Sequence, residues 1–324
     1  MTRKDEHVQL ALKQSASSND FDKLRIVHHS LAAIDIESVD YATNLGSLTL
    51  EHPFYINAMT GGSAFTKIIN RNLALVAKET GLMMAVGSMS SIFKDPTTLD
   101  SFSIVREVNP EGLILANLNL NYSIEQAREA IAAIKADGIQ FHLNSPQEIA
   151  MPEGDDQFNH WSEQIKQLNT LEVPVIIKET GFGMSSKTIQ QLLDLNTKII
   201  DLSGKGGTDF VKIESARNRQ QFDYLENWGQ STVESLLQAQ PYLDQATFIA
   251  SGGIRHPLDV LKALAMGAKA VGVSRTFLSY LMEHGVEETI VYIQQWQLHL
   301  KRLMALVGAI DLASLAQIDF FISD

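Results

Sequence analysis

The 324-residue sequence predicts an α/β fold, a closed (β/α)8 TIM barrel with a short N-terminal extension and an extra C-terminal helix. Three observations support this prediction. Eight short apolar runs recur along the chain, amphipathic helical patterns fall between them, and every run ends in small or polar residues. We therefore expect an extension over residues 1–50 and a barrel over residues 51–324.

The eight apolar runs are typical of buried parallel strands, because they mix β-branched and other apolar residues. Most are followed directly by Gly, Ser, Asn or a charged residue. They occupy residues 53–57, 83–88, 113–118, 139–143, 173–179, 198–203, 247–251 and 270–274. A doubly wound open sheet is the alternative arrangement, and the number of runs together with the residues at their ends favours the barrel.

Apolar residues with helical spacing lie between these runs. They indicate helices near residues 65–76, 124–134 and 258–265, each with one apolar face. Gly138 and Gly267 are expected to end two of these helices as C′ glycines. A further pattern over residues 286–307 predicts the last barrel helix or an extra C-terminal helix.

The composition excludes several classes of protein. Asp and Glu outnumber Lys and Arg by 38 to 26, and the resulting net charge of −12 disfavours binding to nucleic acid or anionic membrane. The absence of Cys excludes disulfides, thiolate zinc sites, iron–sulfur clusters and a Cys nucleophile. No run reaches the roughly 18 apolar residues of a membrane helix, and residues 1–20 lack a signal-peptide core, so we expect a cytoplasmic protein.

Two polar segments invite more than one interpretation. The charged sequence RKDEH at residues 3–7 is ordinarily a solvated tail. Alternatively, it is an arm that folds over a site and binds phosphate through Arg3 and Lys4. Residues 204–230 form a long polar connection for a barrel loop, which we expect to be functional or mobile.

The last two predicted strands end in glycine-rich segments, SGGIR at residues 251–255 and GVSR at residues 272–275. In a barrel, the carboxyl ends of the strands face the active site. Glycines ahead of a helix allow close backbone approach and leave N–H groups free, which makes the phosphate site common in such barrels. The alternative is that these glycines only permit tight turns, and the pairing of the two segments favours a phosphate site.

The fourth and fifth strand ends carry candidate ligand-binding side chains. Lys178 would neutralise a bound anion there, unless it is an ordinary surface lysine. The fourth end carries His142, Asn144, Gln147 and Glu148, and the single carboxylate could hold Mg²⁺ together with phosphate oxygens and water. The competing interpretations are a buried histidine with internal partners and an ordinary first helical turn.

Together these motifs resemble the type II isopentenyl-diphosphate isomerase family. The resemblance covers Arg3 to about Arg275 and includes the end of the third strand at Asn117. The matching segments are RKDEH, AMTGG, GSMS, HLNSPQE, KETGFG, DLSGKGGT, SGGIR and GVSR. RKDEH and HLN-x-x-QE are the specific motifs, whereas the others are shared more loosely among flavin barrels.

The resemblance implies an isomerase of isoprenoid biosynthesis that interconverts isopentenyl diphosphate and dimethylallyl diphosphate. It also implies reduced FMN, Mg²⁺, NADPH as the reductant, and a homotetramer or homo-octamer. The diphosphate substrate would be held by Arg3, Lys4, His142, Asn144 and Gln147, and Mg²⁺ by Glu148. The residues implied to line FMN are Ala58, Met59, Thr60, Ser88, Asn117, Lys178, Ser203, Thr208, Gly253, Arg255, Ser274 and Arg275.

The implied reaction moves a proton across an unactivated allylic system and therefore needs a strong acid. The predicted strand ends offer no such acid, so we expect N5 of the reduced flavin to deliver and retrieve the proton without net redox change. The predicted catalytic residues of the chain are Gln147, His142 and Asn144. Gln147 is expected to position the substrate or to assist proton transfer.

The net charge of −12 creates a local requirement, because both predicted ligands are anions. The substrate diphosphate is expected to find positive charge in Arg3, Lys4, His142 and bound Mg²⁺. The FMN is expected to find it in Lys178 and Arg255.

Two other functions remain as alternatives. An FMN-dependent 2-hydroxy-acid oxidase or dehydrogenase uses a similar barrel, but that family has a histidine base and an arginine near its sixth and seventh strand ends. The sixth strand end here reads SGKGGT and contains no histidine. A non-catalytic flavin- or phosphate-binding barrel is the other alternative, and such a carrier would not need the polar groups of HLNSPQE.

Overall fold

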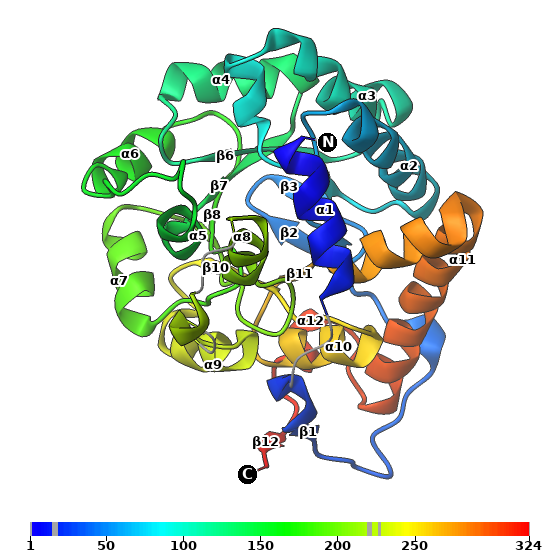
Figure 1. Cartoon of the computed structure of the whole chain (residues 1–324). Coiled ribbons are helices and arrows are strands. Elements are labelled where there is room, and N and C mark those ends of the chain that lie inside the picture. The colour runs from blue at the N-terminus through cyan, green and yellow to red at the C-terminus, as the bar shows by residue number, and fades with distance from the viewer. Residues whose placement is uncertain (1, 15–18, 219–221, 226–227, 324) are drawn as a thin grey trace.

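A closed eight-stranded parallel barrel forms the centre of the computed structural model, which describes residues 2–14, 19–218, 222–225 and 228–323. All eight predicted strand runs are confirmed. The hydrogen-bonded order is β10-β11-β4-β5-β6-β7-β8-β9, so the chain closes the barrel between β11 and β4 (Figure 1). The strands are β4 (Phe54–Ile56), β5 (Met84–Ala85), β6 (Ile114–Asn119), β7 (Gly138–His142), β8 (Val175–Lys178), β9 (Ile199–Asp201), β10 (Thr247–Ser251) and β11 (Ala270–Val273).

Helices surround the barrel in the alternating order that the sequence predicts (Figure 1). The outer ring consists of α2 (Ala64–Thr80), α3 (Asp100–Val108), α4 (Ile124–Ile134), α6 (Trp161–Leu168), α7 (Ser186–Asp194), α9 (Thr232–Ala239), α10 (Pro257–Ala265) and α11 (Arg275–Leu306). Shorter helices lie in the connections: α5 (Ser145–Ala150), α8 (Phe210–Asn218) and α12 (Leu312–Leu315). The long connection over residues 204–230 thus contains a helix, α8, rather than only irregular chain.

One of the two predicted helix-ending glycines is correct. Gly267 has a φ of 97° just after α10, as a C′ glycine requires. The prediction for Gly138 is wrong, because α4 ends at Ile134 and Lys135 takes the left-handed conformation with φ 47°. Gly138 instead begins β7, where a Cβ atom would lie 2.9 Å from the side chain of Leu115.

The predicted pattern over residues 286–307 corresponds to the second part of helix α11, which is the extra C-terminal helix. Helix α11 follows β11 directly, and it is interrupted by a non-helical residue, Gly285, with φ 82°. The part before Gly285 is the last barrel helix, and the part after it runs along the outside of the barrel, where α11 contacts α2 (Figure 1).

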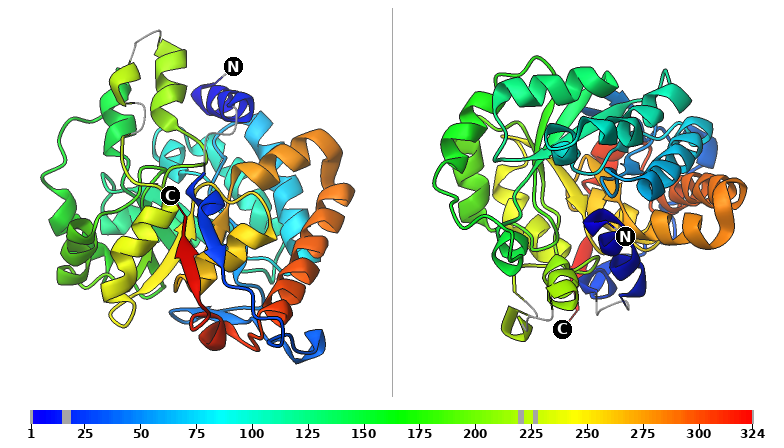
Figure 2. Two further views of the ribbon diagram at one scale, coloured as in Figure 1. Left: turned by 90° about the horizontal axis from the view of Figure 1, so that it is seen from below. Right: turned by 45° about the horizontal axis from the view of Figure 1, so that its top comes forward.

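The N-terminal extension contacts both ends of the barrel. Its elements are α1 (Arg3–Lys13) and the short turns η1 (Asp20–Asp22) and η2 (Ile36–Ser38), with the strands β1 (Leu24–Ile26), β2 (Thr43–Leu45) and β3 (Leu48–Leu50). The β2–β3 hairpin packs its leucines against Tyr55, Ile176 and Ile249 of the barrel strands. Strand β1 pairs antiparallel with β12 (Phe320–Ile322), so the part of the N-terminal extension at residues 24–26 lies beside the C-terminal strand (Figure 2).

Helix α1 lies at the carboxyl ends of the strands beside α8 (Figure 1; Figure 2, left). It contacts α8, α2 and α11. The Ser63 hydroxyl at the start of α2 donates to Asp5 of α1 at 2.6 Å, which docks the arm on the barrel. None of the helices in the described part of the chain combines the length and apolar character needed to cross a bilayer.

Candidate active site

A pocket at the carboxyl ends of the strands contains every residue for which the sequence predicts a site role. The strand register explains part of this convergence: His142 pairs with Lys178 between β7 and β8, and Lys178 pairs with Asp201 between β8 and β9. The predicted residues lining the pocket are Arg3, Lys4, Ala58, Met59, Thr60, Ser88, Asn117, His142, Asn144, Gln147, Glu148, Lys178, Ser203, Thr208, Gly253, Arg255, Ser274 and Arg275. Their roles remain predictions.

Two glycine-rich loops form what we call the phosphate end of the pocket, together with the loop after β11. The loop after β9 and the loop after β10 approach backbone to backbone, so that a Cβ atom on Gly252 would lie 2.0 Å from the carbonyl oxygen of Gly204. Gly252 and Gly253 have φ values of 90° and 77°, which a glycine adopts without strain. In the described chain, the N–H groups of Gly252, Gly253 and Ile254 donate to no protein acceptor. Free donors on a close-packed backbone fit a phosphate group.

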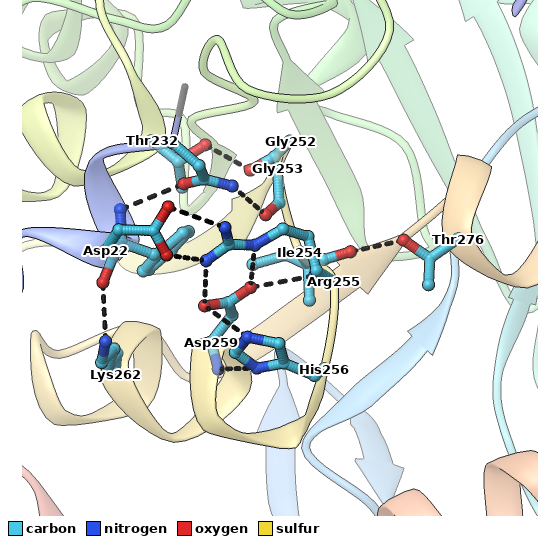
Figure 3. A network of polar contacts seen from close by, with 12 residues as sticks. Asp22, Thr232, Gly252, Gly253, Ile254, Arg255, His256, Asp259, Lys262 and Thr276 are labelled. Carbon is cyan, nitrogen blue, oxygen red and sulfur yellow. Dashed lines mark hydrogen bonds and ion pairs between the residues drawn. The ribbon is translucent and has the colours of Figure 1, made fainter. Parts of the chain in front are cut away.

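The cation expected for this phosphate is already balanced by carboxylates. The guanidinium of Arg255 donates to Asp259 at 2.8 and 3.0 Å and to Asp22 at 2.7 and 2.9 Å (Figure 3). Hydrogen bonds to Asp259 and Asp22 raise the pKa of Arg255. Arg255 therefore adds little net positive charge to the pocket. Arg275, by contrast, is bonded to the backbone carbonyl of Gln14 at 3.1 Å, with no carboxylate partner among the described residues.

Lys178 is the last residue of β8 and lines the bottom of the pocket, which we call the barrel floor; the buried carboxylate of Asp201 is nearby. The Lys178 ammonium donates to the carbonyl oxygen of Glu179 at 2.8 Å. Burial lowers the pKa of Lys178, whereas the neighbouring Asp201 acts in the opposite direction. Asp201 in turn accepts from Ser251 at 2.7 Å and from Asn57 at 3.1 Å. The charge of the cation predicted to face the flavin is thus favoured by the nearby Asp201, which the sequence analysis did not single out.

His142 is a neutral side chain in this pocket. Burial, followed by the charges of Lys178 and Lys4, lowers its pKa to about 3. This pKa disagrees with the expectation that His142 supplies positive charge to a diphosphate, chiefly because the ring is buried and further because Lys178 and Lys4 lie nearby. Nδ1 lies 2.8 Å from Oδ1 of Asn117. Because an amide oxygen only accepts, this contact assigns the proton to Nδ1 and leaves Nε2 as an acceptor.

Asn144 and Glu148 form a polar pair at the start of α5. Asn144 Nδ2 donates to Glu148 Oε1 at 2.6 Å, and the N–H of Asp155 donates to Oε2 at 3.0 Å. Oδ1 of Asn144 is buried without a partner in the described structure, so a ligand group could complete it. No group of three or more His, Cys, Asp or Glu side chains suited to a metal occurs in the described chain. A cation at Glu148 would therefore need ligand oxygens and water, as Mg²⁺ commonly does.

The opposite end of the pocket, which we call the arm end, is lined by Arg3, Lys4 and His7 of α1. Burial, together with the nearby charges of Arg3 and Lys94, lowers the pKa of Lys4 to about 8. No carboxylate is bonded to Lys4 in the described chain, whereas Arg3 lies 3.6 Å from the exposed Glu153. The arm interpretation of RKDEH thus agrees with the observed position of α1. Arg3 is paired there only with an exposed carboxylate, and Lys4 with none among the described residues.

Glu214 of α8 connects three segments of the arm end, and sequence reasoning missed it. Its fully buried carboxylate accepts from Gln147 Nε2 at 3.1 Å, lies 2.9 Å from His7 Nε2, and pairs with Arg217. Burial raises the pKa of Glu214, but the hydrogen bonds from His7, Gln147 and Arg217 outweigh it, so the net shift is downward. Helix α8 has no clear apolar face, so no sequence pattern marked this residue as buried.

One family model identifies the class of protein, and two solved structures show the same fold. The model of the FMN-dependent dehydrogenase family matches residues 110–320. A mutant flavocytochrome b2 with benzoylformate is similar over 96% of this chain and 81% of that one, with a TM-score of 0.72 and 17% identity. A mutant mandelate oxidase with a monooxide FMN adduct has a TM-score of 0.67 at 17% identity and covers 98% and 92%. At such identities, these structures establish the barrel fold alone.

Curated relatives identify the family within this class of protein. Isopentenyl-diphosphate delta-isomerase from Staphylococcus haemolyticus is 47% identical over 98% of this chain and 92% of the relative. The proteins of the same name from Staphylococcus epidermidis and Staphylococcus aureus are 45% and 46% identical, over 99% and 97% of this chain and 93% and 91% of theirs. The chain belongs to the isopentenyl-diphosphate delta-isomerase family, as the motifs predict.

Proposed function

We propose that this pocket interconverts isopentenyl diphosphate and dimethylallyl diphosphate by a 1,3-proton shift, with reduced FMN and Mg²⁺. The observation that carries the proposal is the arm end. Arg3 and Lys4 of α1 line the same pocket as His142, Asn144 and Gln147, which come from the barrel. The family relationship supports the reaction, and the match to FMN-dependent dehydrogenases supports the flavin.

The arm end is suited to a diphosphate because Lys4 has no bonded carboxylate in the described chain and Arg3 is paired only with the exposed Glu153. Lys4 is free of an ion pair in the described structure, and its pKa of about 8 leaves it mostly charged at neutral pH. The neutral His142 would contribute an acceptor to hydration water or to a protonated phosphate oxygen. Val8 and Ala11 of α1 also line the pocket, so the arm would cover the hydrocarbon part of the substrate and exclude water from a developing carbocation.

Gln147 is held in one orientation by Glu214. Gln147 Nε2 donates to the Glu214 carboxylate, which fixes the orientation of the amide. The amide oxygen of Gln147 has no protein donor in the described chain and is available to the substrate. We propose that Gln147 positions the reacting carbons and that the Gln147–Glu214 pair assists the second proton transfer. Reduced FMN, when bound, would supply the proton donor and acceptor at N5 without net redox change.

The residues of the phosphate end and barrel floor fit FMN. The free N–H groups of Gly252, Gly253 and Ile254 would hold the flavin phosphate, and Arg275 would add charge. Lys178 would face the electron-rich part of the reduced ring. The remaining residues proposed to line the flavin are Ala58, Met59, Thr60, Ser88, Asn117, Ser203, Thr208, Arg255 and Ser274.

Glu148 is the residue proposed to reach Mg²⁺, with diphosphate oxygens and water completing the coordination. The Glu148→Gln variant should raise the Mg²⁺ concentration for half-maximal activity by about 10–100-fold. Titration of Mg²⁺ after removal of divalent ions with EDTA measures this. An unchanged Mg²⁺ requirement would contradict the assignment.

The proposal is tested by anaerobic incubation in D₂O with FMN, NADPH, Mg²⁺ and isopentenyl diphosphate. Dimethylallyl diphosphate carrying deuterium is the expected product. Absence of both product and deuterium uptake would support a non-catalytic carrier instead. Conversion of a 2-hydroxy acid to a 2-oxo acid in air would support the oxidase. Replacement of FMN by 5-deazaFMN, which has carbon at position 5, should abolish isomerisation, and full activity would contradict flavin acid–base chemistry.

The family resemblance supports three further parts of the proposal: NADPH as the reductant, a cytoplasmic location and a homotetramer or homo-octamer. Analytical ultracentrifugation checks the last of these, and a monomer at micromolar concentration would contradict it.

A further inference from the structure

The carbonyl oxygens of the loop after β10 are held from outside the pocket. The hydroxyl of Thr232, the first residue of α9, lies 2.7 Å from the carbonyl oxygens of both Ser251 and Gly252 and donates to them as a three-centre hydrogen bond. Figure 3 shows the contact with Gly252. Gly204 N–H donates to the same Ser251 oxygen at 3.0 Å. Thr232 is fully buried, so water does not replace this contact.

The next two carbonyl groups are held in the same way. Asn19 Nδ2 donates to the oxygen of Gly253 at 2.5 Å, and the hydroxyl of Thr276 donates to the oxygen of Ile254 at 2.5 Å. Four consecutive carbonyl groups thus have protein donors, each from outside the loop. The three amide groups of Gly252, Gly253 and Ile254 have no protein acceptor in the described chain.

These two observations are connected by the geometry of the peptide bond. In a planar trans peptide, the carbonyl oxygen of one residue and the N–H of the next point in opposite directions. The Thr232 bonds therefore determine where the N–H groups of Gly252 and Gly253 point, and the Asn19 bond does the same for Ile254. Both residues are glycines with positive φ, so no side chain restricts the rotation of these peptides.

We infer that Asn19 and Thr232 are positioning residues for the flavin phosphate: by holding the loop's carbonyl groups outward, they aim its free N–H groups into the pocket. This inference rests on the proposed binding of FMN. It assigns phosphate affinity to a pre-oriented backbone, because a donor group that is already oriented loses little freedom on binding.

The position of Asn19 is itself fixed by an ion-pair cluster. Asp22, three residues along the extension, accepts from Arg255 through both carboxylate oxygens, and Asp259 holds the same guanidinium from α10 (Figure 3). Lys262 donates to the carbonyl oxygen of Phe21 at 2.6 Å, which attaches the same turn a second time. Arg255 therefore links Asp22 of the N-terminal extension to Asp259 of α10 and keeps the extension against the loop; we call these three residues the clasp.

The test compares FMN with riboflavin, which has the same ring and no phosphate. Apoprotein is titrated with each flavin, and binding is followed by quenching of flavin fluorescence. Thr232→Val and Asn19→Ala should each weaken FMN binding by about tenfold, while riboflavin binding changes less than about twofold. Thr232→Ser keeps the hydroxyl and should retain FMN binding within about twofold.

Thr80→Val is the matched control, because the buried Thr80 hydroxyl also donates to a backbone carbonyl at 2.7 Å, within α2. It should leave both affinities unchanged even if it lowers the melting temperature as much as Thr232→Val. Equal weakening of FMN and riboflavin, or no weakening of either, would overturn the inference. Wild-type protein that binds FMN no better than riboflavin would overturn the proposed phosphate site as well. Asn19→Ala, outside the barrel, decides the matter if Thr232→Val does not fold.

Discussion

The two ends of the pocket suit anions, and they are built in opposite ways. The phosphate end presents backbone N–H groups whose peptides are held by surrounding side chains, and its nearest guanidinium, that of Arg255, is already balanced by Asp22 and Asp259. The arm end presents side-chain cations of α1, and Lys4 among them has no carboxylate partner in the described chain.

This difference indicates different duties. Backbone dipoles cannot titrate, and a loop that is bonded on its outer side stays in one conformation, which suits a cofactor that remains bound. Side-chain cations on an N-terminal helix can move with the helix, and Lys4, with a pKa of about 8, can also lose its charge, which suits a substrate that enters and leaves. The predictions below separate the two ends, beginning with the largest effect.

Glu214→Gln should lower kcat by about 10²–10⁴-fold, because it removes the buried carboxylate that bonds Gln147 and that we propose assists proton transfer. FMN affinity should remain within about twofold, since Glu214 lies at the arm end. Steady-state kinetics and flavin titration measure the two quantities. Glu153→Gln is the control, because this half-exposed acid also contacts Arg217, at 3.4 Å, and should leave kcat nearly unchanged. A loss of FMN binding in Glu214→Gln would break the distinction between the ends.

Lys4→Met should lower kcat/KM by about 10–100-fold through weaker diphosphate binding, because it removes a charge-assisted contact while keeping the length of the side chain. The exposed Lys13 of the same helix supplies the control, and Lys13→Met should have little effect. If both substitutions lowered kcat/KM equally, the effect would come from the overall charge of the arm rather than from a specific contact.

The pH dependence should also differ between the ends. Below its pKa of about 8, Lys4 is charged and attracts the diphosphate; above that pH it loses its proton, and kcat/KM should fall by up to about tenfold per pH unit. Between pH 7 and 9, FMN affinity should stay nearly constant. In Lys4→Met, the alkaline fall in kcat/KM should disappear. Its persistence would assign the titration to another group.

The smallest effect is expected for Arg255→Lys, which keeps the charge but loses the forked geometry of the clasp. The melting temperature should fall by only about 1–3 °C, since the bonds to Asp22 are largely exposed. FMN affinity should change by less than about threefold. A much larger loss of affinity for FMN than for riboflavin would indicate that Arg255 binds the phosphate directly. Both ends of the pocket would then bind anions through side-chain cations.

The barrel was predictable because parallel strands buried on both faces are continuous apolar runs. Each of the eight runs became a strand, and the residues at their ends reached one pocket because parallel strands share one direction. Gly138 was assigned wrongly to a helix end because a glycine required by close packing and one required by positive φ look alike in a sequence.

The site was predictable only as far as the strand ends. Glu214, which holds Gln147, comes from a helix within a long connection and carries no local signature. His142 is neutral because it is buried beside two lysines, and this environment could not be predicted from a sequence motif. Asn19 acts on Gly253, 234 residues away along the chain.

The sequence alone determined the barrel, the flavin-type strand ends and the family, because these depend on local periodicity and on residue types at fixed positions. The tertiary structure decided which charges are balanced, which amides are free and which side chains meet across the pocket. The physical reason is that hydrogen bonding, ion pairing and desolvation act between groups close in space, whatever their separation along the chain. Arg255 illustrates this: its motif predicted a phosphate ligand, and the surrounding carboxylates place it in a clasp.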